Sequence, residues 1–437
     1  MRKQTVSFFL SLLAAGLMIS SAALAADTEE GFVSLFNGKD LTGWSVKGGS
    51  ATYKVEDGAI VGTCVPNTPN NTFLCSDKEY GNFIFKCEFK VIDPGNSGIQ
   101  FRSHARAEGD GERVFGYQCE IDPSEKFDTA RIYDEGRRGF QHGRTWLNDI
   151  NPEWKAAAEA SYKAGEWNEM EIQCVGTSLR TWLNGNPVSK TFDYYDLSGF
   201  FGLQIHAGEK GTVAWRNIRI KDLGVSQWQP FFVEKDGKWD IEGAYKFVPE
   251  CWSFVEKDGV TALWGHHVKS EPKDGLIVSN DNYDNFAAKV TYIINGGNSA
   301  LYFRAEEVDT TWLLRGYQNE ISGDTSEASI WHTAGTPNDP PGRGWLDRED
   351  AAKAETRFKL VEALRSTDSW NTVCTCANGD HIMTFLNGFP ITDILDPDGE
   401  KTGKLGLQLH GGADVDMWFR DFEVIPFTKE MTELIDR

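Results

Sequence analysis

Short runs of alternating apolar and polar residues recur along the chain, separated by Gly, Asn, Asp and Pro. The run "FIFKCEFKV", residues 83–91, is typical. A period of two sends one set of side chains into a core and the other set toward solvent. Such runs between turn residues indicate antiparallel strands, and their number indicates sandwiches. The pattern therefore predicts an all-β protein.

Turns and insertions can be located on this pattern. "LNGNPV" and "LNGFPI" place Asn-Gly between two strand-like runs, which predicts tight hairpins because Asn and Gly tolerate positive φ. Two stretches, residues 151–167 and 348–364, have a helical composition instead. We expect them to form short helical insertions over one edge of a sandwich.

The sequence contains an internal repeat. "YGNFIFKCEFKV" from Tyr80 matches "YDNFAAKVTYII" from Tyr283, "GYQCEI" matches "GYQNEI", and "GLQIHAG" matches "GLQLHGG". The order of these segments is preserved at a spacing near 200 residues, which is too long for a solenoid repeat and indicates two whole domains. The expected organisation is a leader at 1–25, a first domain at 26–222, a linker at 223–228 and a second domain at 229–430.

The first 25 residues have the pattern of a secretory signal. Arg2 and Lys3 precede an apolar run that ends in Ala23-Leu24-Ala25. An uncleaved membrane anchor is the alternative, but the apolar run is short and ends in small residues. We expect an exported protein, periplasmic or secreted, cleaved near Ala25 and without stable membrane insertion.

The net charge and the cysteine positions bear on the class of partner and on disulfide formation. The formal charge of -21 argues against a nucleic-acid partner, and the 44 glycines and 15 tryptophans suit a turn-rich β protein. Among the eight cysteines, Cys64 and Cys75 could close a loop, whereas Cys374 and Cys376 share one strand face, an awkward geometry for a mutual disulfide. Most of the cysteines are expected to be small buried side chains.

The stretch "GYQCEIDPSE" carries the first candidates for chemistry. Gln118, Glu120 and Asp122 alternate, so they share a strand face at successive spacings of about 7 Å. Two carboxylates on one concave face repel each other, which raises the pKa of one toward the range of a general base. The alternative is a solvated outer face. Glu120 is the stronger candidate because Glu320 repeats it.

Two further strand ends carry polar pairs. Gln100 and Arg102 alternate in "NSGIQFRS", where the guanidinium could hold an oxyanion or a sugar hydroxyl pair, or form a salt bridge to Glu120. Gln204 and His206 alternate in "GLQIH", where the imidazole could be a base, a metal ligand or a structural group.

The turn "RIYDEGRRG" is the most charged of the candidate segments. Tyr133 could stack on a sugar or protonate it, and Asp134 and Glu135 could bind a cation or act as an acid, with Arg138 close by. A solvated loop is the alternative. The second domain keeps an aromatic residue here, Trp331, but loses the acid pair, so the fold does not require these charges.

With these motifs in order, the first unit resembles the 3-keto-disaccharide hydrolase family. The matching segments are "LFNGKDLTGW", "NSGIQFRS", "GYQCEIDPSE", "RIYDEGRRG", "EWNEMEI", "TWLNG" and "GLQIH", which span nearly all of residues 31–223. The resemblance implies a concanavalin A-like jelly-roll sandwich in each domain. The second unit departs from the pattern, since Ser322 stands opposite Asp122 and "IYDEG" becomes "IWHTAG".

The resemblance also implies a substrate and a reaction. A ketone at carbon 3 of a sugar acidifies the hydrogen on carbon 2, so a base can remove it and the carbon 1 substituent can leave by β-elimination. Water addition then completes a hydrolysis. The expected partner is an oxidised (3-keto) di- or oligosaccharide or glycoside, and Glu120, Asp122 and His206 would suit a divalent cation.

The expected residue roles follow from this chemistry. For catalysis we predict Glu120, Asp122, Arg102 and His206; for substrate binding Gln100, Gln118, Tyr133, Asp134, Glu135, Arg138 and Gln204; and as second-domain counterparts Arg304, Gln318, Glu320, Trp331, Gln408 and His410.

Two other functions stay open at this point. A carbohydrate-binding protein without catalysis would use the same fold and the same aromatic residues. The spacing of Glu120, Asp122 and Glu125 also resembles the carboxylates of retaining β-glucanases, although Pro123 could turn Glu125 off the strand face.

Overall fold

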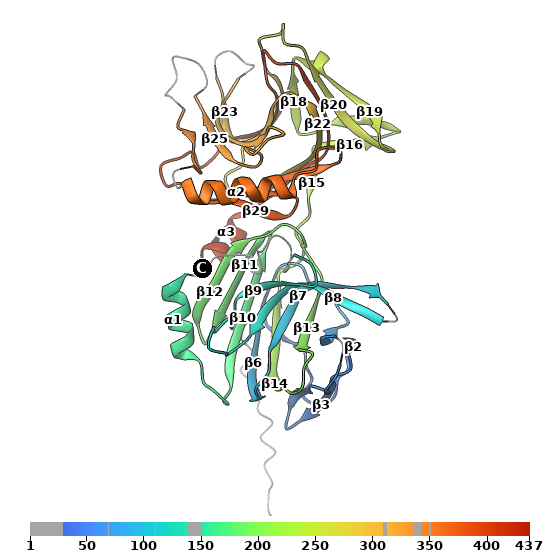
Figure 1. Cartoon of the computed structure of the whole chain (residues 1–437), viewed down its shortest axis with the longest axis vertical. Coiled ribbons are helices and arrows are strands. Elements are labelled where there is room, and N and C mark those ends of the chain that lie inside the picture. The colour runs from blue at the N-terminus through green and yellow to red at the C-terminus, as the bar shows by residue number, and fades with distance from the viewer. Residues whose placement is uncertain are drawn as a thin grey trace, which may run out of the picture.

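The computed structural model describes residues 29–68, 70–109, 111–138, 151–308, 313–334, 342–348 and 351–437. They form two lobes in chain order, coloured blue to green and yellow to red in Figure 1. Strands of the first lobe end at Asp222 and those of the second begin at Gln229. The predicted leader at 1–25 lies outside the described residues.

The first lobe is a sandwich of two antiparallel sheets. The larger sheet has the order β12-β11-β10-β6-β14-β4-β3 with β1 beside β14, and the smaller has the order β2-β5-β13-β7-β8-β9. Their bounds are β1 Val33–Ser34, β2 Trp44–Gly48, β3 Thr52–Glu56, β4 Ala59–Thr63, β5 Thr72–Ser76, β6 Phe83–Asp93, β7 Ser97–Glu108, β8 Gly111–Ile121, β9 Ile132–Glu135, β10 Asn168–Val175, β11 Ser178–Leu183, β12 Asn186–Phe192, β13 Phe200–Ile205 and β14 Thr212–Asp222.

The second lobe repeats this architecture. Its larger sheet has the order β19-β20-β31-β22-β27-β28-β29 with β15 beside β31, its smaller sheet has the order β18-β21-β30-β23-β24-β25-β26, and β16 and β17 form a hairpin. The bounds are β15 Gln229–Pro230, β16 Phe232–Lys235, β17 Lys238–Ile241, β18 Ala244–Phe247, β19 Trp252–Lys257, β20 Val260–His267, β21 Gly275–Ser279, β22 Phe286–Gly296, β23 Ser299–Glu307, β24 Leu314–Ile321, β25 Ile330–Thr333, β26 Gly344–Trp345, β27 Asn371–Asn378, β28 His381–Leu386, β29 Phe389–Leu395, β30 Lys404–Leu409 and β31 Val415–Pro426, with a 3-10 turn at Pro249–Cys251. The predicted all-β fold of two tandem sandwiches is confirmed.

The predicted helices and hairpins also form. Helix α1 (Pro152–Ser161) lies beside the edge strand β12, and α2 (Ala351–Leu364) contacts the edge strand β29 (Figure 1). In the hairpin before β12, Asn184 and Gly185 have φ values of +48° and +80°, so the Asn-Gly pair supplies the turn as expected. No helix in the described part of the chain is long and apolar enough to cross a membrane.

A buried arginine ties each sandwich together. Arg102 is fully buried, and its guanidinium donates to the carbonyls of Gly81 and Gly176, both at 2.8 Å. It also donates to Asn82 Oδ1 at 3.1 Å, and the same oxygen accepts from Gly176 N. Arg102 therefore joins the turn before β6 to the turn after β10.

This position corrects the prediction that Arg102 takes part in catalysis. Arg102 has a φ of +45°, and β7 shifts register between Phe101 and His104, so the simple alternation that grouped Arg102 with Gln100 breaks here. The salt bridge to Glu120, considered as the alternative role, does not form either, because the guanidinium donates to carbonyl and amide oxygens.

The second sandwich repeats the tie in detail. Arg304 also has a φ of +45°, and it donates to the carbonyls of Asp284 and Gly379 and to Asn285 Oδ1. In both units a glycine passes close to the arginine backbone: a Cβ on Gly403 would lie 2.5 Å from the carbonyl carbon of Arg304. The repeated Phe-Arg motif is therefore structural.

A C-terminal helix that the sequence did not reveal joins the two lobes. Helix α3 (Lys429–Asp436) lies at their junction (Figure 1). Gln173 Nε2 donates to Leu434 O at 2.8 Å and Arg180 Nη1 to Ile435 O at 2.9 Å, so two β-strands of the first lobe bind the end of the helix. Ile435 is fully buried among side chains of both lobes.

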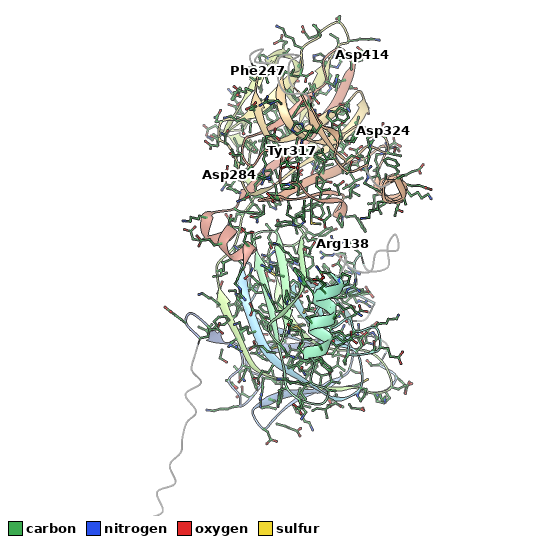
Figure 2. The ribbon with its side chains drawn as sticks, turned by 90° about the vertical axis from the view of Figure 1, so that its left-hand side faces the viewer. Arg138, Phe247, Asp284, Tyr317, Asp324 and Asp414 are labelled. Atoms are coloured by element: carbon green, nitrogen blue, oxygen red, sulfur yellow. The ribbon has the colours of Figure 1, made fainter. Side chains whose placement is uncertain are left out.

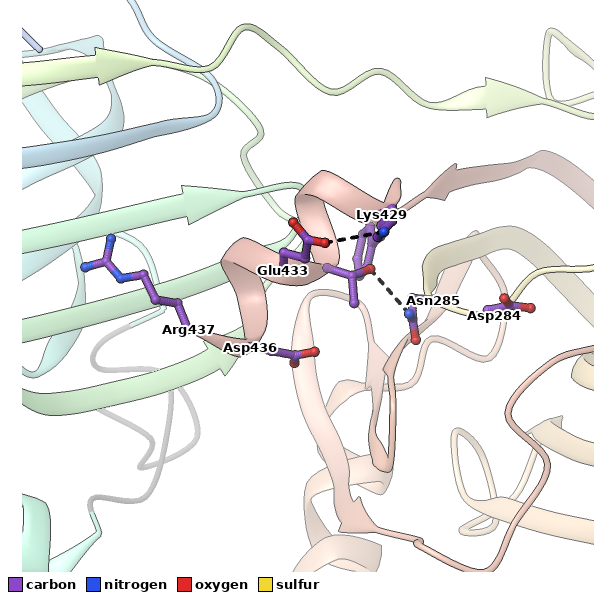
Figure 3. A pocket seen from close by; sticks show the side chains of 8 residues that line it. Asp284, Asn285, Lys429, Glu433, Asp436 and Arg437 are labelled. Carbon is purple, nitrogen blue, oxygen red and sulfur yellow. Dashed lines mark hydrogen bonds and ion pairs between the residues drawn. The ribbon is translucent and has the colours of Figure 1, made fainter. Parts of the chain in front are cut away.

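A pocket of about 600 Å³ lies beside α3 (Figure 3). Its polar groups pair with each other, since Asn285 Nδ2 donates to Thr432 Oγ1 at 3.3 Å and Lys429 lies 3.8 Å from Glu433. This pocket belongs to the packing of the helix against the second lobe.

All eight cysteines are unbonded, so the loop closure considered for Cys64 and Cys75 does not occur in this structure. Cys374 and Cys376 share a face of β27, as predicted, and are fully buried. Cys376 Sγ lies 3.4 Å from Thr177 Oγ1 of the first lobe, so this face is part of the domain junction.

The tie predicts a stability effect. Replacing Arg102 by Met leaves several buried carbonyl oxygens without donors, which should lower the free energy of unfolding by roughly 3 kcal/mol or more. Arg304→Met should behave alike, whereas the exposed Arg106→Met should stay within about 0.5 kcal/mol of wild type. Urea unfolding measures this; unchanged stability in Arg102→Met would contradict the structural role.

Candidate functional site

A hollow of about 410 Å³ opens on the outward face of the six-stranded sheet of the first sandwich. Polar side chains from β8, β9, β13 and the segments that lead into β5 and β7 surround it. The lining residues are Asn70, Asn71, Asn96, Arg113, Gln118, Glu120, Asp122, Tyr133, Glu135, Gln204, His206 and Ala207. Seven of the eleven side chains predicted for the first domain belong to this set.

The alternation of β8 produces the floor of the hollow. Tyr117, Cys119 and Ile121 point into the sandwich core, so Gln118 and Glu120 point the other way. The neighbouring strand β9 pairs Tyr133 with Gln118, which brings the aromatic ring to the same face. This part of the prediction is confirmed: Gln118, Glu120 and Asp122 do line one hollow.

Glu120 is the most perturbed carboxyl of the site. It is only 5% exposed, and it accepts hydrogen bonds from Gln118 Nε2 at 2.5 Å and from Asn96 Nδ2 at 3.1 Å. Burial raises its pKa to about 8, more than these two hydrogen bonds lower it, and the charges of Glu135 and Asp122 add to the rise. Such a carboxylate is a strong base for its type.

A row of three buried glutamines supports Glu120. Gln100 Nε2 donates to Gln118 Oε1 at 2.7 Å, and Gln118 Nε2 lies 3.4 Å from Gln204 Oε1. Gln100 lies behind the hollow and does not line it, and its Oε1 accepts a hydrogen bond from Ser103 Oγ at 2.6 Å. The amide nitrogen of Gln204 is buried and has no hydrogen-bond partner among the described residues, so this donor is available to a ligand.

An ion pair stands on the opposite wall. Arg113 Nη2 donates to Glu135 Oε1 at 3.0 Å, and Asn71 Nδ2 donates to the same oxygen at 3.3 Å. Burial nevertheless raises the pKa of Glu135, and Arg113 offsets part of the rise. Burial and the charges of nearby carboxylates raise the pKa of Tyr133 to about 12, so its hydroxyl keeps its proton.

Asp134 and Arg138, predicted to bind substrate, lie elsewhere. Residues that follow one another in a strand alternate, so Asp134 points inward from β9 while its neighbours Tyr133 and Glu135 line the hollow. Although burial opposes ionisation, Arg138 and Arg137 lower the pKa of Asp134. The predicted substrate-binding role of Asp134 and Arg138 is therefore corrected.

This inward cluster belongs to the domain junction. Arg138 Nη1 donates to Asp193 Oδ2 at 2.8 Å and to the carbonyl of Gly388 in the second lobe. Figure 2 shows Arg138 at the end of the first lobe that faces the second. The hydrogen bond from Arg138 to Gly388 thus crosses the domain junction.

His206 and Asp122 both reach the hollow. His206 is exposed and its Nδ1 lies 2.6 Å from Ala207 O, while Asp122 Oδ1 accepts from Ser124 N at 3.1 Å. Glu125 is exposed and does not line the hollow, which disfavours the glucanase-like carboxylate pair. In the described part of the chain, no group of three or more His, Cys, Asp or Glu side chains converges to hold a metal ion.

The sequence prediction missed four polar residues of this site, namely Asn70, Asn71, Asn96 and Arg113. Asn96 stands in the repeated "NSGIQFRS" motif and could have been found there, since Asn298 repeats it. Asn70 and Asn71 precede β5, and the pairing of β5 with β13 brings them to the hollow, whereas Arg113 lies on β8 at an odd spacing from Gln118.

The second sandwich has a hollow of about 720 Å³ at the equivalent place. Of the predicted counterparts it brings together Gln318, Glu320, Trp331, Gln408 and His410, and it leaves out the structural Arg304. Burial raises the pKa of Glu320 to about 7, against the hydrogen bond from Asn298.

Comparison with known proteins identifies the class of domain. A family model described as the 3-keto-alpha-glucoside-1,2-lyase-like domain matches residues 31–221 and again residues 227–425. The chain therefore belongs to this family and carries two tandem copies of its domain. The protein is therefore a carbohydrate-active protein. No curated protein matches the chain.

Each of three solved structures matches a stretch of the chain about as long as one domain. Two candidate glycosyl hydrolases from Parabacteroides distasonis match at 25% and 23% identity and TM-scores of 0.29 and 0.30; they cover 44% and 46% of this chain and 94% and 99% of their own. A carbohydrate-binding module from Bacillus subtilis matches at 16% identity and a TM-score of 0.31, with 43% and 99% coverage.

The buried carboxyl predicts a pH effect on stability. Folded Glu120 holds its proton up to about pH 8 while the unfolded chain releases it near its ordinary value of 4.5, so stability falls as pH rises through this window. Glu120→Gln removes this loss, which amounts to about 5 kcal/mol at pH 9.

Thermal unfolding at pH 5 and pH 9 measures the effect. The difference in melting temperature between Glu120→Gln and wild type should be larger in favour of the variant at pH 9 than at pH 5. For the exposed Glu125→Gln, this difference should be the same at both pH values. A difference for Glu120→Gln that is the same at both pH values would show that the folded carboxyl titrates normally.

Proposed function

We propose that the first domain cleaves the glycosidic bond of 3-keto-glycosides by removing the carbon 2 proton and eliminating the carbon 1 substituent. The family assignment supports a sugar substrate, and the buried Glu120 carboxyl at the floor of the hollow is the observation that carries the proposal. Water addition to the eliminated sugar makes the net reaction a hydrolysis.

Glu120 is the proposed general base. Its raised pKa means that its carboxylate binds a proton more tightly than an exposed glutamate does, which favours removal of a weakly acidic C–H proton. Asn96 and Gln118 hold the carboxyl in place through hydrogen bonds. The base form accumulates as the pH rises toward 8 and above.

The negative charge that develops on the carbon 3 oxygen needs a donor. The buried Gln204 amide nitrogen, which lacks a partner among the described residues, is one proposed donor, and Arg113 on the opposite wall is the second. Arg113 replaces Arg102 in this role. A fixed donor in a desolvated hollow stabilises the enolate without reorganisation of solvent.

Elimination then breaks the bond from carbon 1 to the leaving oxygen. The electron pair of the enolate forms the carbon 1–carbon 2 double bond and restores the carbon 3 ketone, and the leaving oxygen takes a proton. Tyr133 lines the hollow and keeps its hydroxyl proton up to a pKa of about 12, so it is the proposed acid. His206 and Asp122 at the rim are placed to bind hydroxyls or guide the added water.

An exported location is part of the proposal. The N-terminal pattern of Arg2, Lys3, an apolar run and Ala25 supports secretion to the periplasm or beyond. Substrates would then be glycosides oxidised at carbon 3 outside the cytoplasm.

Product release from a 3-keto-glucoside and from its unoxidised parent tests the proposal. Wild type should release the aglycone only from the keto sugar, and Glu120→Gln should lower kcat by about 10²- to 10⁴-fold, the usual contribution of a general base. Glu125→Gln, which alters an exposed carboxyl of the next turn, is the matched control and should keep its activity.

Three results would contradict the proposal. Activity retained in Glu120→Gln would remove the proposed base. Cleavage of the unoxidised parent with loss of activity in Glu125→Gln would instead favour a retaining glycosidase. Binding of the keto sugar without any turnover would indicate a binding protein.

A further inference from the structure

The hollow of the second sandwich keeps the polar floor of the first. Gln318 and Glu320 project from β24 as Gln118 and Glu120 do from β8, and both are at least nine-tenths buried. Asn298 Nδ2 donates to Glu320 Oε2 at 3.3 Å. The arrangement that can accept and donate hydrogen bonds to sugar hydroxyls has therefore survived the divergence of the two copies.

The groups that could stabilise an enolate have not survived. Strand register places Thr333 where the first domain has Glu135, and the residue three before the shared glycine is Leu313 in place of Arg113. Neither Lys nor Arg is among the described side chains that line this hollow. Among the described lining residues, the oxyanion of a keto sugar would therefore meet no lysine or arginine.

The free amide of the first site is also occupied in the second. Gln408, the counterpart of Gln204, donates its Nε2 to Asp274 Oδ2 at 2.7 Å. Asp274 stands where the first domain has Asn71, because each residue precedes the strand that pairs with the glutamine. A single change from amide to carboxylate thus removes the donor on which enolate stabilisation in the first domain rests.

The second hollow is instead richer in aromatic rings than the first. Tyr302 replaces Gln100, Trp331 replaces Tyr133, and Trp345 joins them from β26. The rings of Trp331 and Trp345 meet edge to face with centroids 5.0 Å apart, and Arg348 packs 3.3 Å from the centroid of Trp345. This pair is thus held rigidly, and both indoles remain half-buried at the hollow.

We propose that this second hollow is a binding site for a neutral, unoxidised hexose unit, which it holds without cleaving. The C–H face of a pyranose ring packs against an indole, while Gln318, Glu320 and Asn298 bind the hydroxyls. The carboxyls of Asp274 and Glu320, with no lysine or arginine among the described lining residues, disfavour uronates and sugar phosphates. The proposal does not depend on the reaction assigned to the first domain.

Titration of the full-length protein with maltose, cellobiose and trehalose, followed by calorimetry, tests the site. We expect one binding site in wild type, with a dissociation constant no weaker than ~10 mM for at least one of these sugars. Trp331→Ala should weaken that binding at least tenfold, because a buried aromatic contact is the kind that dominates recognition. Trp331→Phe, which keeps a ring, should bind more tightly than Trp331→Ala and controls for misfolding.

Two matched variants complete the design. Trp239→Ala removes a partly exposed tryptophan of β17 and should bind like wild type. Tyr133→Ala alters the hollow of the first domain and should leave this binding unchanged. No binding of any of the three sugars would overturn the proposal, and so would binding that persists in Trp331→Ala but is lost in Tyr133→Ala.

Discussion

The period-two alternation of β8 is the constraint on which the site depends. Tyr117, Cys119 and Ile121 bury one face of this strand in the sandwich core, and the same geometry forces Gln118 and Glu120 onto the outward face. Because neighbouring strands add polar side chains around it, Glu120 is buried although it points out of the core. A carboxyl so desolvated, with only neutral hydrogen-bond donors against it, becomes a base.

Duplication separated what the fold requires from what the site uses. Arg102 and Arg304 keep the same backbone conformation and the same carbonyl partners, so both copies still need this tie. The residues of the two hollows have diverged instead: Arg113 and Glu135 give way to Leu313 and Thr333. One copy retains charge near a basic carboxylate, and the other has gained aromatic rings.

The strand pattern was enough to predict the fold, the repeat and the polar floor of the site. Gln118, Glu120 and Gln204 were found because their strands alternate regularly. Arg102 was assigned to the wrong face of β7 because its positive φ breaks the alternation of the strand. No residue type in "FRS" predicts such a break. Asp134 was misplaced because a four-residue strand was taken as a polar loop.

Residues brought in by sheet order could not be predicted in the same way. Asn71 reaches the hollow from the residue before β5, and the pairing of β5 with β13 is decided by the packing of the whole sandwich. Arg113 lies on β8 five residues before Gln118, an odd spacing that strict alternation would place on the other face. Helix α3 was missed because its apolar face is short, and it is stabilised by contacts with both lobes.

The most direct test of the central claim is hydrogen exchange at carbon 2, followed by proton NMR of a 3-keto-glucoside in D₂O. If Glu120 removes the carbon 2 proton, wild type should produce a keto sugar that carries deuterium at carbon 2, faster than the uncatalysed exchange, and Glu120→Gln should not. Products released by wild type with the original hydrogen still on carbon 2 would contradict the account, because the bond would then be cleaved without an enolate.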